Sequence, residues 1–484
     1  MLEATCWATV SKLEFLQVMS VTENKASILI KGGWLVTMNR QREIKQGDLL
    51  IEDGIIKAIG HFKGPARLTI DASEMIVLPG FIQTHVHLCQ VLFRGLADDV
   101  DVVDWLKHRI WPLENAHDEE SIYCSAWLGI AELLAGGTTT ILAMETTRHT
   151  DAVFQALLES GMRAVAGNAM MDVQEPGTEM EGQDSRTVLA ESKRLWRSWH
   201  GRDNGRLQYA LTPRGPRNCS PELLSEIARL SAEEGLLVHS HAAENGPLAE
   251  RVARETGVRD VVLFHRLGLA SPRLVLAHCI WLDEQELELA ASTGIKVTHC
   301  PSANLKLSSG FAKIPEMRSR GINVSLGADG APCNNNLDMF NEMRLAALIH
   351  KPRCGPRTLP AEEVLEMATL GGARALGLEK EIGSLEVGKK ADVTLVRRDR
   401  FHSSPWQRVP LPSQIVYSLK AGDVDTTLVE GRILYRHGRL TMRAGNDIVE
   451  AANTAIERVL ERVPFGREFG RQPGSRIWSS ERGV

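Results

Sequence analysis

Residues 78–87 read LPGFIQTHVH, an apolar run with strand-forming residues that ends in two histidines separated by one residue. Further short apolar runs follow along the chain, and amphipathic segments such as SPELLSEIARLSAEEG (residues 220–235) separate them. The eight runs are LPGFIQTHVH, GTTTILAME, RAVAGNAM, LQYALTP, LLVHSHAAE, LVLAHC, KVTHCP and NVSLGADG. Eight strands that alternate with helices predict an α/β fold of the (β/α)8 TIM-barrel type. An open, doubly wound sheet is the alternative with the same alternation.

Polar side chains gather where these predicted strands end, and this distinguishes the two folds. In (β/α)8 barrels the active site lies at the carboxyl ends of the strands. The clustering therefore favours the barrel and predicts that these side chains share one site. They are His85, His87, His241, Glu244, His278, His299 and Asp329.

Two segments that flank the predicted barrel alternate apolar and polar residues around glycine turns, which is typical of strands. ASILIKGGWLVTM begins at residue 26, and GSLEVGKKADVTLV begins at residue 383. We expect the two segments to build one small β-sandwich, with the barrel inserted between its halves. The predicted division is an N-terminal extension (1–25), the first sandwich segment (26–78), the barrel (79–380), the second sandwich segment (381–440) and a helical C-terminal tail (441–484).

The composition excludes several classes of protein. The chain has 484 residues, of which 43% are hydrophobic and 24% charged, as in ordinary globular proteins and unlike disordered or fibrous ones. Its formal net charge of −5 argues against a surface that coats nucleic acid. No apolar run approaches the ~20 residues that a membrane helix needs. The first residues lack the basic start and cleavage site of a secretory signal.

The eight cysteines are scattered, and no two form a Cys-x-x-Cys pair. This usage favours a reducing compartment, so we expect a cytoplasmic protein.

Four of the strand-end residues make a complete ligand set for one divalent metal. His85 and His87 follow the first predicted strand, His241 ends the fifth, and Asp329 ends the eighth. Three imidazoles and a carboxylate suit Zn²⁺, and Fe²⁺ is the alternative. His239 competes with His241 for the role of third imidazole, but His241 lies nearer the strand end. On its own, Asp329 would be read as a turn residue before Gly330.

Several runs together resemble the amidohydrolase superfamily, in particular its branch related to cytosine and adenosine deaminases. They are PGFIQTHVH, HSHAAE, LAHC, HCPSANLKL, LGADGAPCNNNLDMFNEMR and GSLEVGKKADVTLV. The resemblance covers nearly all of residues 26–440 and implies a β-sandwich joined to a metal-bearing (β/α)8 barrel. RGLADDVDVVDWLKHRIWPLE (94–114) and LDMFNEMRLAALIHKP (337–352) also resemble the group that deaminates 5′-deoxyadenosine, 5′-methylthioadenosine and S-adenosylhomocysteine.

The resemblance implies a hydrolytic deaminase with one metal ion per subunit. Members with two metals carry a bridging lysine at the end of the fourth strand, where this chain reads LQYALTPRG without a lysine. Glu244 is the candidate for collecting the proton of the attacking water and passing it to the ring nitrogen. His278 would steady the attacking oxygen, with a role as a further metal ligand as the alternative. Asp329 would move the second proton toward the departing ammonia. His299 is expected to be structural or to line the pocket.

The substrate is expected to be a purine, and two readings of its identity remain open. Glu114 matches the position that relatives use for ribose hydroxyls, and Trp111 offers a flat wall for a purine or sugar, which favours an adenosine modified at its 5′ position. Arg214, which follows Pro213, and Gln90 instead resemble deaminases of guanine or 8-oxoguanine. An aminotriazine hydrolase on the same scaffold is a further alternative. No nucleic acid or membrane partner is expected, and we expect a homo-oligomer.

Overall fold

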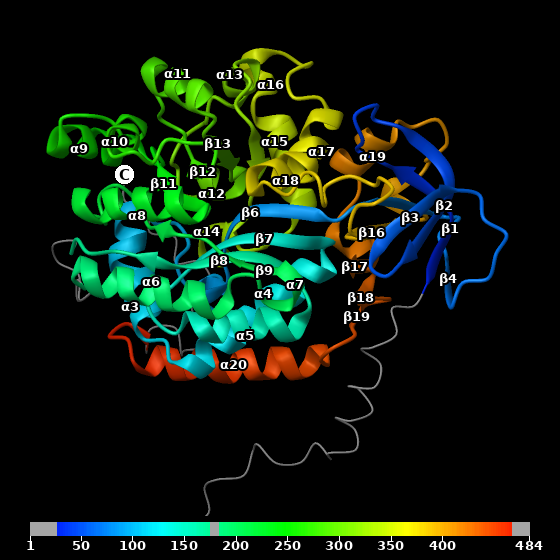
Figure 1. The fold of residues 1–484 in the computed structure, drawn as a ribbon, viewed down its shortest axis with the longest axis horizontal. Helices are drawn as coiled ribbons and strands as arrows, with labels where there is room; N and C mark the ends of the chain where they lie inside the picture. Colours follow the sequence, from blue (N-terminus) through cyan, green and yellow to red (C-terminus); the bar gives the residue numbers. More distant parts are fainter. Residues whose placement is uncertain (1–26, 175–182, 467–484) are drawn as a thin grey trace, which may run out of the picture.

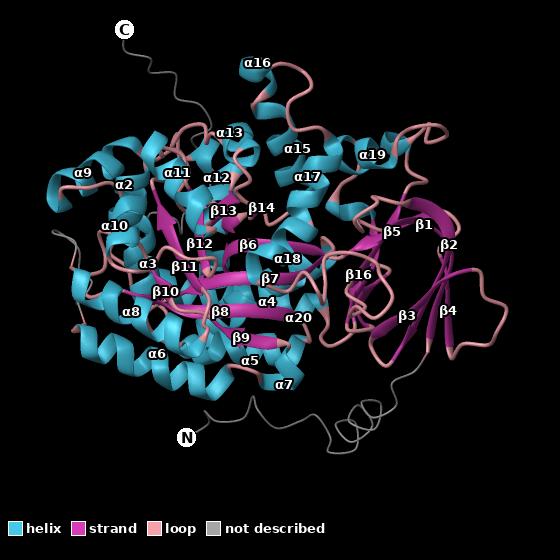
Figure 2. Ribbon diagram, turned by 45° about the horizontal axis from the view of Figure 1, so that its top comes forward, coloured by secondary structure: helices cyan, strands magenta, loops and turns pink. Residues whose placement is uncertain are grey.

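The computed structural model describes residues 27–174 and 183–466 of the chain (Figure 1). The predicted N-terminal extension and the last part of the predicted tail lie outside the described residues. The remainder is a mixed α/β structure in which a large helix-covered part adjoins a part made mainly of strands (Figure 2). The expected α/β class with parallel strands is confirmed.

Parallel strands carry the predicted site residues. The first of these strands, β6 (Phe81–His87), is buried along its whole length. All seven of its residues are buried, as in strands covered on both faces. One parallel sheet joins β10 (Thr212–Pro213), β8 (Arg163–Met170), β7 (Thr138–Glu145), β6 and β15 (Asp329–Gly330) in this order, and β9 (Leu207–Tyr209) pairs with β8. The other joins β11 (Val238–Ala242), β12 (Leu274–His278), β13 (Lys296–His299) and β14 (Val324–Leu326).

Two connections link these parallel sheets. A parallel bridge between Leu211 and Val238 joins the fourth predicted strand run to β11. At the other edge, β14 pairs with β13, while β15, which follows it in the same run, pairs with β6. Between the strands, the Thr84 hydroxyl lies 2.8 Å from that of Thr298 and 2.7 Å from that of Ser325. The first strand therefore contacts the seventh and eighth in the interior.

Helices follow the strands in alternation, and several begin at side-chain caps that the sequence supplies. Asp118 accepts a hydrogen bond from the backbone of Ser121, and Ser220 accepts one from that of Leu223. The helices of this part are η1 (Leu88–Phe93), α2 (Val102–Trp105), η2 (Leu106–Ile110), α3 (Trp111–Asn115), α4 (Glu119–Ala135), α5 (Thr150–Ser160), α6 (Ser185–Trp199), α7 (Arg202–Gly205), α8 (Pro221–Glu234), α9 (Gly246–Thr256), α10 (Asp260–Arg266), α11 (Glu284–Thr293), α12 (Pro301–Lys306), α13 (Ile314–Ser319), α14 (Ala331–Asn334), α15 (Met339–Ile349), α16 (Lys351–Cys354), α17 (Ala361–Ala368) and α18 (Leu370–Leu376).

The two end segments pair with each other, as expected for one unit built from both. They form a single nine-stranded sheet in which β5 and β16 join the halves in antiparallel fashion. The predicted division into two sandwiched layers stays a prediction. The order is β19 (Arg439–Leu440), β18 (Arg432–Arg436), β17 (Val424–Val429), β16 (Val393–Arg397), β5 (Met75–Pro79), β1 (Ile28–Val36), β2 (Ile44–Glu52) and β3 (Ile55–Gly60), with β4 (Leu68–Asp71) paired to β1; η3 (Phe401–Ser403), α19 (Leu411–Tyr417) and η4 (Ala421–Asp423) lie between β16 and β17.

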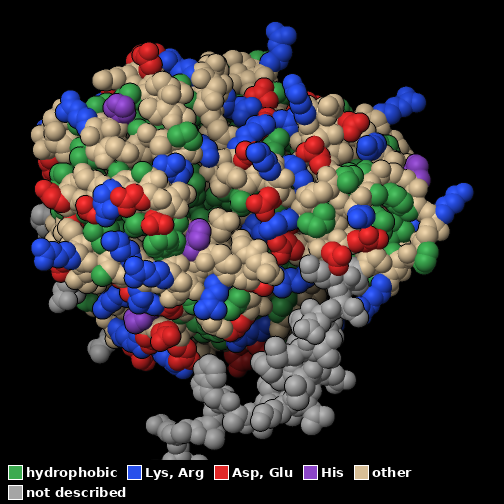
Figure 3. Space-filling view, viewed as in Figure 1, with side chains coloured by type: hydrophobic (Ala, Val, Ile, Leu, Met, Phe, Trp, Pro, Cys, Tyr) green, Lys and Arg blue, Asp and Glu red, His purple; other side chains and the backbone are tan. Residues whose placement is uncertain are grey.

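The described part of the tail is helical, as expected. α20 (Gly445–Glu461) lies along the lower edge of the view in Figure 1 and packs against α4, and its Ala452, Ala455 and Val459 pack against Phe93 and Leu113. Basic and acidic side chains are interspersed over the face drawn in Figure 3. Among the described residues, no helix is both long and apolar enough to cross a membrane, and the cysteines are free thiols.

Candidate active site

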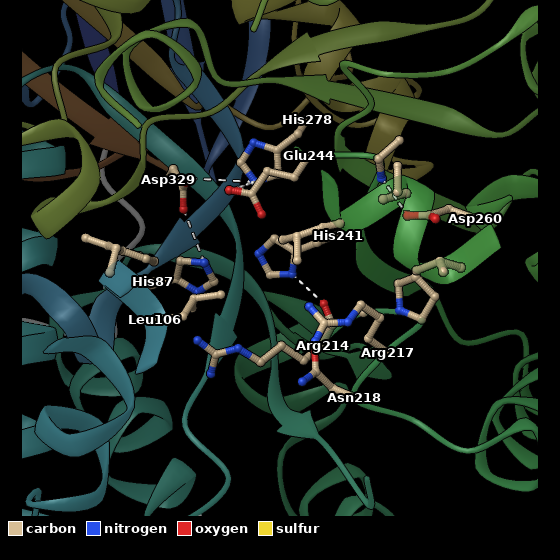
Figure 4. Close-up of a pocket in the computed structure, with 18 of the residues that line it drawn as sticks. His87, Leu106, Arg214, Arg217, Asn218, His241, Glu244, Asp260, His278 and Asp329 are labelled. Atoms are coloured by element: carbon tan, nitrogen blue, oxygen red, sulfur yellow. Dashed lines mark hydrogen bonds and ion pairs between the residues drawn. The ribbon is translucent and has the colours of Figure 1, made fainter. Parts of the chain in front are cut away.

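The strand ends open into a cavity of about 750 Å³ that is open to solvent. His87, His241, His278, Glu244 and Asp329 project toward one another in it (Figure 4). The structure thus brings together side chains from β6, β11, β12 and β15 that the sequence predicted to share a site. The rest of the lining is Gln90, Trp105, Leu106, Trp111, Arg214, Gly215, Pro216, Arg217, Asn218, Ala242, Ala243, Leu248, Ala249, Val252 and Asp260.

Ligand-type atoms converge at the inner end of this cavity. Nε2 of His85 and Nε2 of His87 each lie 3.3 Å from Oδ1 of Asp329. Ligand atoms of His85, His87 and Asp329 lie within 4.8 Å of one another, and the same holds for His85, His241 and His278. A divalent cation needs several nitrogen or oxygen ligand atoms close together, as they are here.

The protonation states of these groups also fit a cation. Burial lowers the pKa of His85 to about 4 and that of His241 well below its usual value, so both rings are neutral near pH 7 and offer a lone pair. Burial alone would raise the pKa of Asp329, but its interactions with His85, His87 and His278 together outweigh burial and hold this pKa well below its usual range. Nε2 of His85 is buried and has no hydrogen-bond partner within the described part of the chain. These observations fit a divalent metal, which His85, His87, His241 and Asp329 would hold.

Hydrogen bonds on the far side of each ring aim its Nε2 atom at this point. His87 Nδ1 lies 2.7 Å from the Met144 carbonyl, and His241 Nδ1 lies 2.5 Å from the Arg214 carbonyl. A carbonyl only accepts, so each Nδ1 carries the proton and each Nε2 is left as the ligand atom.

His239 has a different place from its competitor His241. Its Nδ1 donates to the Val275 carbonyl at 3.0 Å, which leaves Nε2 as an acceptor for His85 Nδ1 at 2.7 Å. His239 is therefore behind His85 and orients it, while His241 faces the cavity.

Glu244 and His278 lie beside the ligand cluster. Nε2 of His278 is 3.9 Å from Oε1 of Glu244 and 3.8 Å from Oδ2 of Asp329. Burial raises the pKa of Glu244, which brings the carboxyl closer to the range in which it can take up and release a proton.

Strained backbone positions these groups. Ala243, His278 and Asp329 have positive φ angles of 46°, 67° and 64°, a region that side-chain-bearing residues rarely adopt. Hydrogen bonds hold the strained turn before Glu244, because the Ala243 amide donates to Asp260 Oδ2 at 2.7 Å. Such strain persists where the surrounding structure enforces it, and it clusters at functional sites.

Glu114 is engaged with two of the other predicted substrate-binding residues. Arg214 Nη1 donates to Glu114 Oε2 at 2.7 Å, and Gln90 Nε2 donates to Glu114 Oε1 at 2.8 Å. Burial raises the pKa of Glu114, but Arg214 outweighs it and the net pKa is lowered. Gln90, Trp111 and Arg214 line the cavity, whereas Glu114 is not among the described residues that line it.

Sequence reasoning missed several residues of the site. Arg217, Asn218 and Asp260 line the cavity without belonging to any recognised motif, and Leu106 also lines it but lies in the run 94–114, which was noted only as part of a resemblance. Asn304 contacts His278, although the run HCPSANLKL was noted only as part of a resemblance. His299 was expected either to be structural or to line the pocket. It is buried and is not among the described residues that line the cavity, which favours the structural role.

Comparison with known proteins gives consistent matches over most of the chain. The Amidohydrolase family model matches residues 76–434. A 5′-deoxyadenosine deaminase of Methanothermobacter thermautotrophicus is 38% identical over 432 residues, covering 89% of this chain and 98% of that protein. A 5-methylthioadenosine/S-adenosylhomocysteine deaminase of Moorella thermoacetica is 39% identical, covering 85% of this chain and 95% of that protein.

Solved structures match as well. An adenosine deaminase from Xanthomonas campestris with bound zinc superposes with a TM-score of 0.83 at 29% identity, covering 89% of this chain and 98% of that one. A guanine deaminase of E. coli gives a TM-score of 0.76 at 28% identity, covering 85% of this chain and 100% of that one.

Proposed function

This chain belongs to the amidohydrolase family, and from that premise we propose that it deaminates the base of a 5′-modified adenosine by hydrolysis. It is a hydrolytic aminohydrolase that acts on a C–N bond of a purine nucleoside, and it gives the inosine analogue and ammonia. The candidate substrates are 5′-deoxyadenosine, methylthioadenosine and S-adenosylhomocysteine, the compounds in the names of its relatives.

The observation that carries the proposal is the place of Glu244 beside the histidine cluster. Its carboxyl lies 3.9 Å from His278 and is buried enough to have a raised pKa. We assign to Glu244 the transfer of a proton from the attacking water to the ring nitrogen next to the amine-bearing carbon. We assign to His278 the orientation of the attacking oxygen. Asp329 passes the second proton to the amine, which leaves as ammonia.

A divalent metal belongs to this site, and we propose that it is one zinc ion per subunit held by His85, His87, His241 and Asp329. When bound, such an ion acts as a Lewis acid that makes water nucleophilic near neutral pH. The donor set supports a single ion. The described ligand groups share His85, and Thr212–Pro213 leads into Arg214 where two-metal members have a lysine.

We propose that Trp111, Gln90 and Arg214 hold the substrate. All three line the same cavity as His87 and His241. The proposed contact of Glu114 with the ribose diol requires the diol to compete with Arg214 for the carboxylate.

A guanine-type substrate is the second candidate, and one observation favours it. Gln90 Nε2 is committed to Glu114, so its buried Oε1, which has no partner within the described residues, is left as an acceptor in the cavity. An acceptor beside the Arg214 donors suits a ring edge with an N–H next to a carbonyl oxygen.

A substrate panel read by ammonia release tests both candidates. It contains adenosine, 5′-deoxyadenosine, methylthioadenosine, S-adenosylhomocysteine, guanine, 8-oxoguanine and an aminotriazine. We expect a 5′-modified adenosine to have the highest kcat/KM. If guanine or 8-oxoguanine has the highest value and Arg214→Ala removes that preference while Glu114→Ala does not, the guanine-type candidate replaces the nucleoside one.

We further propose that the parallel strands form a closed (β/α)8 barrel over residues 79–380 and that segments 26–78 and 381–440 fold as a small β-sandwich. The parallel pairings that lead from β6 through β8 and from β11 through β14, and return through β15 to β6, support the barrel. The homo-oligomeric state and the cytoplasmic location stay predictions.

A further inference from the structure

His278, the imidazole among the proposed catalytic side chains, contacts another side chain through its second ring nitrogen. Its Nε2 is directed at Glu244 and Asp329, while its Nδ1 lies 2.9 Å from Oδ1 of Asn304. The backbone of His278 is in the left-handed region, with φ of 67°, so the strand end does not hold the ring in an ordinary extended geometry. The side-chain contact at Nδ1 restrains the rotation of the ring and with it the direction of Nε2.

Asn304 is well placed to hold the ring because its own helix is anchored. It lies on α12 and is 2% exposed. At the start of this helix, the Ser302 amide donates to Glu342 Oε2 at 3.2 Å and the Ser302 hydroxyl donates to Oε1 of the same carboxyl. Glu342 is fully buried and also accepts from Asn334 at 2.9 Å.

The chemistry of the contact selects one tautomer of His278. An amide oxygen only accepts, so Nδ1 carries a proton whenever this hydrogen bond is made. The proton of a singly protonated ring is then on Nδ1, and Nε2 is left to face the reacting groups. A hydrogen bond at one imidazole nitrogen generally sets the state and direction of the other.

We propose that Asn304 is a positioning residue for the deamination reaction, acting through Nδ1 of His278 to direct its Nε2 at the attacking oxygen. This inference rests on the proposed function, because His278 is assigned its role there. It adds a residue 26 positions away in the sequence that is not among the described residues lining the cavity.

Three variants test the inference in the metal-loaded protein with its best substrate. Asn304→Leu keeps the size of the side chain and removes the acceptor. We expect kcat to fall about 10- to 100-fold, a usual range for the loss of a partner behind a ligand or catalytic group, with KM and metal content unchanged. Asn304→Asp keeps an acceptor at Oδ1, and we expect kcat within about 5-fold of the native value.

Ser302→Ala is the matched control, because it removes the hydroxyl bond to Glu342 but keeps the backbone amide bond that anchors the helix, and it leaves Asn304 intact. We expect it to lower Tm and to keep the native kcat. The inference is overturned if Ser302→Ala lowers kcat as much as Asn304→Leu, since displacement of α12 would then explain both. It is also overturned if Asn304→Asp is as slow as Asn304→Leu, or if Asn304→Leu loses its metal.

The same assays separate this inference from the proposed function. If the native protein releases ammonia and Asn304→Leu does so at the native kcat, the inference fails and the proposed function stands. If the native, metal-loaded protein releases no ammonia from any purine of the panel, the proposed function fails and takes the inference with it.

Discussion

Arg214 and Glu114, 100 residues apart in the sequence, form a buried ion pair at the wall of the cavity, with Nη1 2.7 Å from Oε2. A second bond joins Nη2 to Oε1 at 3.3 Å. The sequence placed Glu114 at a ribose diol and Arg214 at a guanine-type ring. In the structure Glu114 holds Arg214 and offsets its charge, and of the two only Arg214 is among the described residues that line the cavity.

The first prediction concerns the stability that this pair controls. Glu114→Leu or Arg214→Met alone leaves one buried charge without its partner. We expect each to lower the free energy of unfolding by about 3–5 kcal/mol. The double variant removes both charges, so we expect its Tm to lie above that of either single variant. Thermal unfolding of the three proteins measures this, and additive losses of Tm would contradict the pairing as described.

The second prediction concerns the metal. Removal of the metal with a chelator should abolish activity, and re-addition of Zn²⁺ should restore it at about one equivalent per chain. His87→Ala should lose both metal and activity, because it removes one donor of the set. His437→Ala, at an exposed site, is the control and should keep both. Elemental analysis that finds two equivalents would contradict the single-ion site.

The third prediction concerns acid–base catalysis. Glu244→Gln keeps the size of the side chain and cannot transfer a proton, so we expect kcat to fall by about 10²–10⁴-fold. The metal content should stay at the native value, because Glu244 is outside the proposed ligand set. Steady-state kinetics on the metal-loaded variant measures this. Near-native turnover would move the proton transfer to another group, with His278 the nearest candidate.

The fourth prediction concerns pH and Glu342. Burial raises the pKa of this carboxyl from its ordinary value to about 7. Between about pH 4.5 and 7 the folded state therefore binds more protons than the unfolded state, so this group makes the protein less stable as pH rises through that window. Glu342→Gln does not titrate. We expect the Tm of the variant to rise relative to that of the native protein between pH 5 and 7.5, by the equivalent of about 3 kcal/mol at most.

Saturating Zn²⁺ in both samples keeps metal release from contributing to this comparison. A Tm difference that stays constant across the window would show that Glu342 is ionised throughout.

Much of the fold can be predicted from the sequence, because strands that are buried on both faces are continuous apolar runs. The run at 163–170 coincides with β8, and that at 78–87 contains β6. Other runs are interrupted in the structure. The fourth run is divided between β9 and β10, and the eighth between β14 and β15. Where a strand is interrupted depends on its backbone pairing with two neighbouring strands. The hydropathy pattern along one strand carries no information about that pairing.

The sequence by itself determined which chemical groups stand at the strand ends, since a strand of known direction places its last residues at a known edge. It thereby determined that His85, His87, His241 and Asp329 could meet. It also determined that Glu244 follows His241 closely enough to join them.

Only the tertiary structure decided how these groups divide their roles. It placed His239 behind His85, paired Arg214 with Glu114, and set Asn304 against His278. Each of these contacts joins side chains from different segments of the chain, at separations of 154, 100 and 26 residues. Such contacts depend on strand register, helix placement and rotamer together, and no local period in the sequence encodes them.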